Sequence, residues 1–228
     1  MAKPTSSSAF PALVMLIRHG EKPGAPDKDD DTPSPDLSIR GSARAAALPT
    51  LFTPDPTGVG KAGQQLGCGL RTGGSAIFSG TYKTPAATLA PGARFPTPQH
   101  LGAAQASKNS NRPAQTITPV AQALGLKIHA KHPVNDYAAV ASDILKKHAG
   151  EIVLICWHHG KIPALALALG VPRQQVIQAL GGATKWPGSV FDWVWSIDWK
   201  SGSANLTVAN QQLLYGDAAK PNTQGKRP

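Results

Sequence analysis

The chain has 228 residues, 41% apolar and 16% charged, which excludes a disordered protein and is enough for one well-packed domain. The net charge is +10, but no run of lysine and arginine reaches five, so a nucleic-acid surface is not indicated, while attraction of an anionic, phosphorylated ligand stays open. No apolar run approaches the roughly 18 residues of a membrane span, so we expect a soluble, cytoplasmic protein without membrane contact.

The first element is a predicted buried strand over residues 12–17, after a loose, serine-rich tail at 1–10. The strand ends directly on Arg18, His19 and Gly20. In an open α/β sheet, ligands bind beyond the carboxyl ends of strands, and a glycine there lets a ligand approach the backbone. The sequence therefore predicts a functional site at this strand end.

The next stretch is expected to alternate between loops and short elements. Residues 21–36 are a loop rich in proline and aspartate, and residues 37–52 are predicted to form a helix capped by Ser38 and ended near Pro49. Glycine-rich residues 53–74 are predicted to be a loop, followed by a short strand at 75–78. Residues 80–111 are interpreted as one long irregular segment, a lid or binding loop or a disordered segment.

The middle of the chain carries two predicted helices. One covers 113–124, with a kink at Pro119 and an end at Gly125, and a possible strand follows at 127–130. The other covers 137–148, after Asp136 as a helix cap. The other histidines between 100 and 148 are expected at the surface.

The second strongly apolar strand, 151–157, runs into His158, His159 and Gly160 and so repeats the ending of the first. Two short helices are predicted next, and a hairpin of exposed or edge strands closes the domain; these elements cover 162–169, 172–180, 189–198 and 205–214. We predict one domain over 11–215, a polar tail over 216–228, and an α/β fold: a three-layer sandwich with a mainly parallel central sheet flanked by helices and a C-terminal β-hairpin.

Five polar residues gather at these strand ends and at one helix start. They are Arg18, His19, Arg112, His158 and His159. A guanidinium group can donate two parallel hydrogen bonds to the oxygens of one phosphate, and helix N-termini offer free N–H groups to anions. A neutral imidazole is nucleophilic near pH 7. The set therefore favours a site for a phosphoryl group.

In these motifs the sequence resembles the histidine phosphatase superfamily, which includes the cofactor-dependent phosphoglycerate mutases. The family's R-H-G-E is present at 18–21, its L-S/T-x-x-G-x-x-R/Q-A at 37–45 and its R-x-x-Q-T at 112–116. A buried strand followed by a histidine is present at His158, with Ile162 four residues later. The four matches occur in the family's order, over roughly residues 12–170.

The resemblance implies a role for each matched residue. His19 is the nucleophile that becomes phosphorylated, Arg18 and Arg112 hold the phosphoryl oxygens, and His158 stabilises the charge during transfer. Gly20 and Glu21 are assigned to substrate binding, although Glu21 is equally suited to ordering its loop. The resemblance implies a phosphorylated small-molecule substrate, no metal ion and no cofactor.

Two departures from the family pattern leave alternatives open. Two histidines follow the late strand: the spacing to Ile162 favours His158 as the pocket residue, whereas a Trp-x-His pattern favours His159. His159 also occupies the position of a proton donor in the acid phosphatase branch, so it is a candidate general acid. The family's glutamate between Arg112 and the late strand is missing, and Asp136 is interpreted as a cap instead.

The resulting hypothesis is a phosphomonoesterase that acts through a phosphohistidine on His19. The alternatives are phosphoglycerate mutase-like phosphoryl transfer and a catalytically silent phosphate-binding or scaffold protein. The sequence does not identify the phosphate ester or the oligomeric state.

Overall fold

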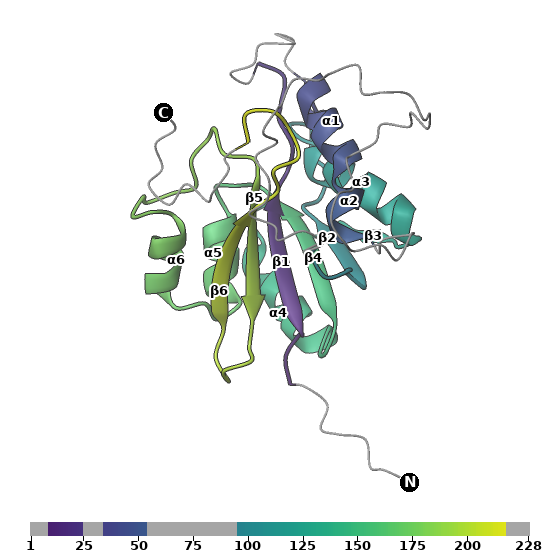
Figure 1. Ribbon diagram of the computed structural model, residues 1–228. Coiled ribbons are helices and arrows are strands. Elements are labelled where there is room, and N and C mark those ends of the chain that lie inside the picture. The colour runs from purple at the N-terminus through teal and green to yellow at the C-terminus, as the bar shows by residue number, and fades with distance from the viewer. Residues whose placement is uncertain (1–8, 25–33, 54–94, 218–228) are drawn as a thin grey trace, which may run out of the picture.

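The computed structural model describes residues 9–24, 34–53 and 95–217. These residues form a mixed sheet with the strand order β3-β2-β4-β1-β5-β6 (Figure 1). Its strands are β1 (Leu13–Arg18), β2 (His100–Ala103), β3 (Ile128–His129), β4 (Ile152–Trp157), β5 (Trp193–Asp198) and β6 (Asn205–Asn210). Strands β3, β2, β4 and β1 are parallel, β5 runs antiparallel to β1, and β6 runs antiparallel to β5. The predicted three-layer α/β fold, mainly parallel with a C-terminal hairpin, is confirmed.

Helices cover both faces of the sheet. They are α1 (Ile39–Ala47), α2 (Pro49–Phe52), α3 (Arg112–Leu124), α4 (Tyr137–Lys147), α5 (Ile162–Ala168) and α6 (Arg173–Ala179). Successive side chains of a strand point to opposite faces. Val14 and Leu16 accordingly pack in a core with α4, α5 and α6, whereas Met15 and Ile17 pack in a second core with α2 and α3. Strand β1 is buried on both faces, as its unbroken apolar run predicts.

The prediction of one long irregular segment over 80–111 is wrong in its last part. Strand β2 lies at His100–Ala103 and pairs in parallel with both β3 and β4. Its sequence lacks β-branched and aromatic residues, so local propensity gives no strand signal and the pairing with β4 decides the structure. The strand predicted at 75–78 lies outside the described residues.

The predicted hairpin is present, but its first strand is not an exposed or edge strand. Strand β5 lies between β1 and β6, and Trp193 and Trp195 are about 1% exposed or less. Their rings lie 5.0 and 5.2 Å from that of Trp186. The alternation of large and polar residues fits an edge strand equally well, and only the antiparallel pairing with β1 makes this strand internal.

The helix boundaries follow the expected local signals except at the start of α4, where the predicted cap is wrong. The Ser38 side chain accepts a hydrogen bond from the Gly41 N–H at the start of α1, and Gly125 ends α3 with a φ of 64°. Helix α3 continues through Pro119. Asp136 precedes α4, but its carboxylate makes no capping bond and lies 3.2 Å from His132 Nδ1.

Contacts of the described residues reach slightly beyond the bounds predicted for the domain, 11–215, at both ends. Phe10 stacks on Trp199 with a centroid distance of 5.6 Å. Asp217, in the predicted tail, pairs with Arg44 at 2.7 Å, and both side chains are about 2% exposed. Among the described residues, no helix is long and apolar enough to span a membrane.

Candidate active site

The nucleophile predicted from the sequence, His19, lies where β1 and β4 end side by side. Arg18 is in register with Trp157, and the His19 N–H donates to the Trp157 carbonyl at 3.2 Å. This parallel pairing places His19 beside His158, the residue that follows Trp157. The ring centroids of His19 and His158 lie 5.7 Å apart, and those of His19 and His159 6.4 Å apart.

The His19 ring is held in one tautomer. Its Nδ1 lies 2.8 Å from the Gly20 carbonyl, and because a carbonyl only accepts, Nδ1 carries the proton. The lone pair is therefore on Nε2, which is buried and has no hydrogen-bond partner among the described residues. Burial first, and then the positive charges of Arg18 and Arg112, lower the pKa of His19 well below 6.5. The imidazole is neutral at pH 7 and its Nε2 is available as a nucleophile.

Two glycines let the loop after β1 lie against the start of α1. A Cβ on Gly41 would lie 2.4 Å from the Glu21 carbonyl oxygen, and a Cβ on Gly20 would lie 3.0 Å from the Gly41 oxygen. Ser38 donates from its backbone N–H to Glu21 O at 3.0 Å. The loop is thus fixed by backbone contact, which explains why glycines occupy both motif positions.

The Arg18 guanidinium is anchored by the loop before β5. Its Nη1 donates to the carbonyls of Gly188 and Val190 at 2.7 and 2.8 Å, and its Cζ lies 3.5 Å from the centre of the Phe191 ring. Its Nε is buried without a partner in the described structure. Burial lowers the Arg18 pKa to about 9, so the group stays charged at pH 7. Sequence reasoning missed this anchor, because carbonyls carry no side-chain signal.

Arg112, at the first position of α3, approaches the site from the second core. Its Nη1 donates to Ser34 O at 3.0 Å and its Nη2 to Asn109 O at 3.2 Å, while its Nε is buried without a described partner. One turn later, Thr116 Oγ1 accepts from the Gly20 N–H at 2.9 Å. Helix α3 therefore supplies a cation and also holds the backbone beside the nucleophile.

Two histidines from the end of β4 complete the group. The ring centroids of His158 and His159 lie 4.4 Å apart. The Gly160 N–H donates to His158 Nδ1 at 3.2 Å, whereas His159 Nδ1 is buried with no partner among the described residues. Burial, followed by the charge of Arg18, lowers the pKa of both residues, that of His159 to about 3. Both candidates for the pocket histidine, His158 and His159, therefore lie beside His19, and His159 is the one with a buried nitrogen that has no described partner.

The Glu21 carboxylate is held by two arginines of α1. Its carboxylate lies 2.7 Å from Arg44 Nη2 and 3.4 Å from Arg40 Nε, and the Glu21 side chain is 4% exposed. Arg44 in turn binds Asp217, and hydrogen bonds from Arg44 hold the Asp217 pKa below its usual value although burial opposes this. Of the two roles predicted for Glu21, this geometry fits the ordering of the loop and gives no contact for a substrate. The sequence offered no sign of Asp217, which is 173 residues from Arg44.

Cations surround the entrance to the site. Besides Arg18 and Arg112, the charges of Lys22 and Lys161 act on His158, and those of Lys22 and Lys185 act on His159. Together they make this end of the sheet positive, which suits an anionic ligand.

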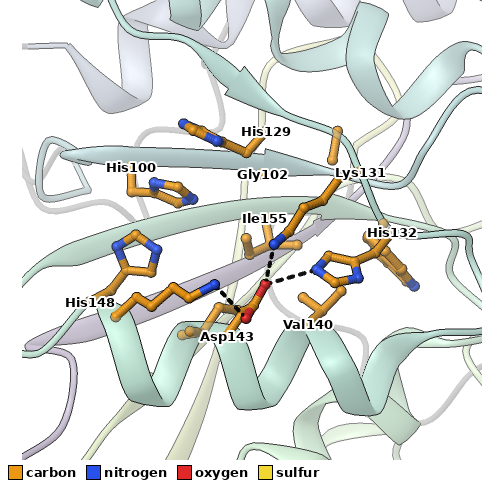
Figure 2. Close-up of a pocket in the computed structure, with 13 residues that line it drawn as sticks. His100, Gly102, His129, Lys131, His132, Val140, Asp143, His148 and Ile155 are labelled. Atoms are coloured by element: carbon orange, nitrogen blue, oxygen red, sulfur yellow. Dashed lines mark hydrogen bonds and ion pairs between the residues drawn. The ribbon is translucent and has the colours of Figure 1, made fainter.

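A separate cavity of about 250 Å³ lies between the β3 edge of the sheet and α4 (Figure 2). The rings of His129, His100 and His148 line one side; the His100 ring stacks on His129 at a centroid distance of 4.6 Å and lies tilted to His148 at 3.8 Å. On the other side, Asp143 binds Lys131 at 2.6 Å and His132 at 3.0 Å. Of the four histidines predicted at the surface, His129 is exposed, whereas His100, His132 and His148 are partly buried, and burial lowers the pKa of His100 to about 4. None of the predicted site residues lines this cavity.

Comparisons with known proteins give fold likenesses only. No family model matches the chain, and no curated protein matches it. A solved structure of SixA, a candidate phosphohistidine phosphatase from Agrobacterium tumefaciens, is 15% identical, with a TM-score of 0.45, over 88% of this chain and 97% of that one. That of a candidate alpha-ribazole-5′-P phosphatase from Escherichia coli K-12 MG1655 is 14% identical, with a TM-score of 0.42, over 89% and 97%. Likenesses at this level do not indicate what this chain acts on.

Proposed function

We propose that the chain is a phosphomonoesterase that hydrolyses a small phosphate ester through a phosphohistidine on His19. One observation carries the proposal. Four buried nitrogens without a described partner belong to side chains at the ends of β1 and β4 and at the start of α3. They are Arg18 Nε, His19 Nε2, Arg112 Nε and His159 Nδ1. An unsatisfied buried polar group costs about 1–3 kcal/mol, so such groups are rarely retained together without a ligand.

The four nitrogens suit a phosphoryl group in charge and in chemistry. Two guanidinium Nε–H groups complement the phosphoryl oxygens, and Nη groups of both side chains already donate to backbone carbonyls, so the side chains are held before substrate arrives. Phosphoryl transfer depends mainly on positioning and on positive charge near the oxygens. The neutral His19 Nε2 supplies the nucleophile.

The reaction follows from these positions. His19 Nε2 attacks phosphorus, the bond from phosphorus to the ester oxygen breaks, and the leaving oxygen takes up a proton. Water then attacks the phosphohistidine, the N–P bond breaks, and inorganic phosphate leaves. His158 and the two arginines stabilise the charge on the transferring group, and Gly20 leaves room for it beside the backbone.

His159 is the proposed proton donor to the leaving oxygen. The positive charge of Arg18 contributes to its low pKa, and a bound phosphate dianion offsets that charge. Burial is the larger cause of the low pKa, and the negative charge of the substrate raises the pKa of His159 at the stage when a general acid is needed. The described residues place no carboxylate among these side chains that would take this role instead.

The test is hydrolysis of p-nitrophenyl phosphate in the presence of a chelator, together with trapping of labelled protein. The protein is incubated with a ³²P-labelled ester, quenched in alkali and analysed for a phosphoprotein that acid removes. Phosphate release with such a label supports the phosphatase, and His19→Asn should abolish both. His148→Asn, a histidine in the separate cavity, is the matched control and should retain both.

Two other results would replace the proposal. Exchange of phosphate between the positions of a phosphoglycerate without net hydrolysis would indicate the mutase-like alternative. Phosphate binding without hydrolysis, exchange or label would indicate a silent phosphate-binding protein.

A further inference from the structure

Three metal-binding side chains converge in the described part of the chain at one place. The ligand atoms of His19, His158 and His159 all lie within 4.8 Å of one another. Three imidazoles with a fourth position open to solvent are a donor set of zinc sites. Among the described residues, the histidines in the cavity of Figure 2 do not meet this criterion, although the ring of His100 lies 4.6 and 3.8 Å from those of His129 and His148.

Two of the three histidines have a nitrogen available for a metal ion. The bond from His19 Nδ1–H to the Gly20 carbonyl leaves the lone pair on Nε2, and this kind of outer hydrogen bond also orients the imidazole ligands of known metal sites. His159 Nδ1 is buried and has no described partner. No rearrangement of hydrogen bonds is required at either residue.

His158 has to give up one weak bond. Its Nδ1 accepts from the Gly160 N–H at 3.2 Å, and this bond is exposed. Binding through Nδ1 displaces the N–H directly, and binding through Nε2 moves the ring proton to Nδ1, which then no longer accepts. The bond is therefore lost in both cases, at small cost because water can satisfy the released N–H.

The surrounding charges determine which ions fit. Imidazole ligands favour zinc, copper and nickel over magnesium and calcium. Arg18 and Arg112 repel a dication, but an anion in the fourth position offsets their charge. The site therefore suits a borderline transition-metal dication of moderate affinity.

We propose that Zn²⁺ binds to His19, His158 and His159 and inhibits the enzyme by occupying the nucleophilic Nε2. The inhibition, unlike the binding, rests on the function proposed above. His19 Nε2 cannot hold a metal ion and attack phosphorus at the same time, so zinc competes with the phosphate ester. The ion is an inhibitor here and takes no part in the reaction.

Binding is measured with Co²⁺ as a spectroscopic substitute for zinc. Titration of the metal-free protein should give the visible absorption of tetrahedral cobalt, saturating at one ion per chain, and excess Zn²⁺ should remove it. His158→Asn and His159→Asn should each weaken binding by at least about tenfold, since even outer-contact losses have that effect. Circular dichroism checks the fold of each variant.

The separate cavity provides the control. His148→Asn removes a histidine there and should leave the cobalt spectrum unchanged. Loss of the spectrum in this variant, with retention in the two active-site variants, would assign the ion to the cavity and overturn the proposal. Absence of a tetrahedral spectrum in the unmodified protein would overturn it as well.

Inhibition is measured separately, so that the two proposals fail in different ways. If the metal-free protein hydrolyses p-nitrophenyl phosphate, zinc at the concentration that saturates the spectrum should raise the apparent KM without lowering kcat. Unchanged kinetics at saturation would overturn the inhibitory part. A cobalt spectrum in a protein without hydrolytic activity would refute the proposed function and leave the metal site established.

Discussion

Replacement of Arg44 tests how strongly the loop beside the nucleophile depends on one buried cation. Arg44 lies between two carboxylates, those of Glu21 and Asp217, and all three side chains are 4% exposed or less. The change Arg44→Met removes the cation and leaves both carboxylates buried. Loss of one partner from a buried ion pair costs about 3–5 kcal/mol, because a desolvated charge is left uncompensated. A domain is stable by only about 5–15 kcal/mol, so this loss is large.

A neighbouring arginine provides a matched control. Arg40 reaches the same Glu21 carboxylate at 3.4 Å, but its side chain is 25% exposed. Partly exposed ion pairs contribute about 0–1 kcal/mol. Arg40→Met should therefore reduce the free energy of unfolding by about 1 kcal/mol or less.

The assay is urea denaturation at pH 7, with the free energy of unfolding extrapolated to water. We expect the two variants to differ by about 2–5 kcal/mol, which is the difference between the two estimates. Equal losses in both variants would refute the reasoning, because burial would then have no influence on the strength of the contact. Adding Glu21→Gln to Arg44→Met should partly restore the free energy of unfolding, because it removes one of the two uncompensated buried carboxylates.

Three further predictions address the site and its surroundings. Gly41→Ala places a Cβ 2.4 Å from backbone and should cost at least about 1–3 kcal/mol of stability, whereas Gly188→Ala, with no atom within 4 Å, should cost less than about 0.5 kcal/mol by the same denaturation assay; equal losses would contradict the packing argument. His159→Ala should reduce hydrolysis of alkyl phosphates by about a hundredfold and spare p-nitrophenyl phosphate, which needs no proton donor, and equal effects on both esters would exclude it as the general acid. Between pH 6.5 and 4 the unfolded chain binds a proton at His100 that the folded chain does not, so the free energy of unfolding should decrease as the pH is lowered through this range. In thermal melts, His100→Gln should make this decrease shallower. An unchanged slope in that variant would show that His100 is not responsible.

The sequence predicts those parts of the structure that depend on local signals. The apolar runs that become β1 and β4, the Ser38 cap and the Gly125 helix end were all predicted from neighbouring residues. Strand β2 was not, because its four residues have weak strand propensity and owe their conformation to β4. The same holds for the internal position of β5, which pairing with β1 determines.

The candidate site divides in the same way. The motifs predicted Arg18, His19, Arg112, His158 and His159 as site residues, and the parallel pairing of β1 with β4 explains why His19 lies beside His158 and His159. The supporting contacts were not predictable, since the carbonyls that hold Arg18 lie about 170 residues away and carry no side-chain signature. The Arg44–Asp217 pair likewise joins two segments that no local pattern relates.

The central position of β1 has a consequence for the order in which the protein is made. Leu13 pairs with Ile152 and Val14 with Ile197, so β1 lacks one neighbour until residue 152 and the other until residue 197 has been synthesised. Contacts so distant in sequence form slowly, and unpaired apolar strands aggregate while they wait. Arg18 gains its carbonyls only with residues 188 and 190, and Arg44 its second carboxylate only with residue 217. Arg18 and Arg44 are thus translated long before the residues that complete their surroundings.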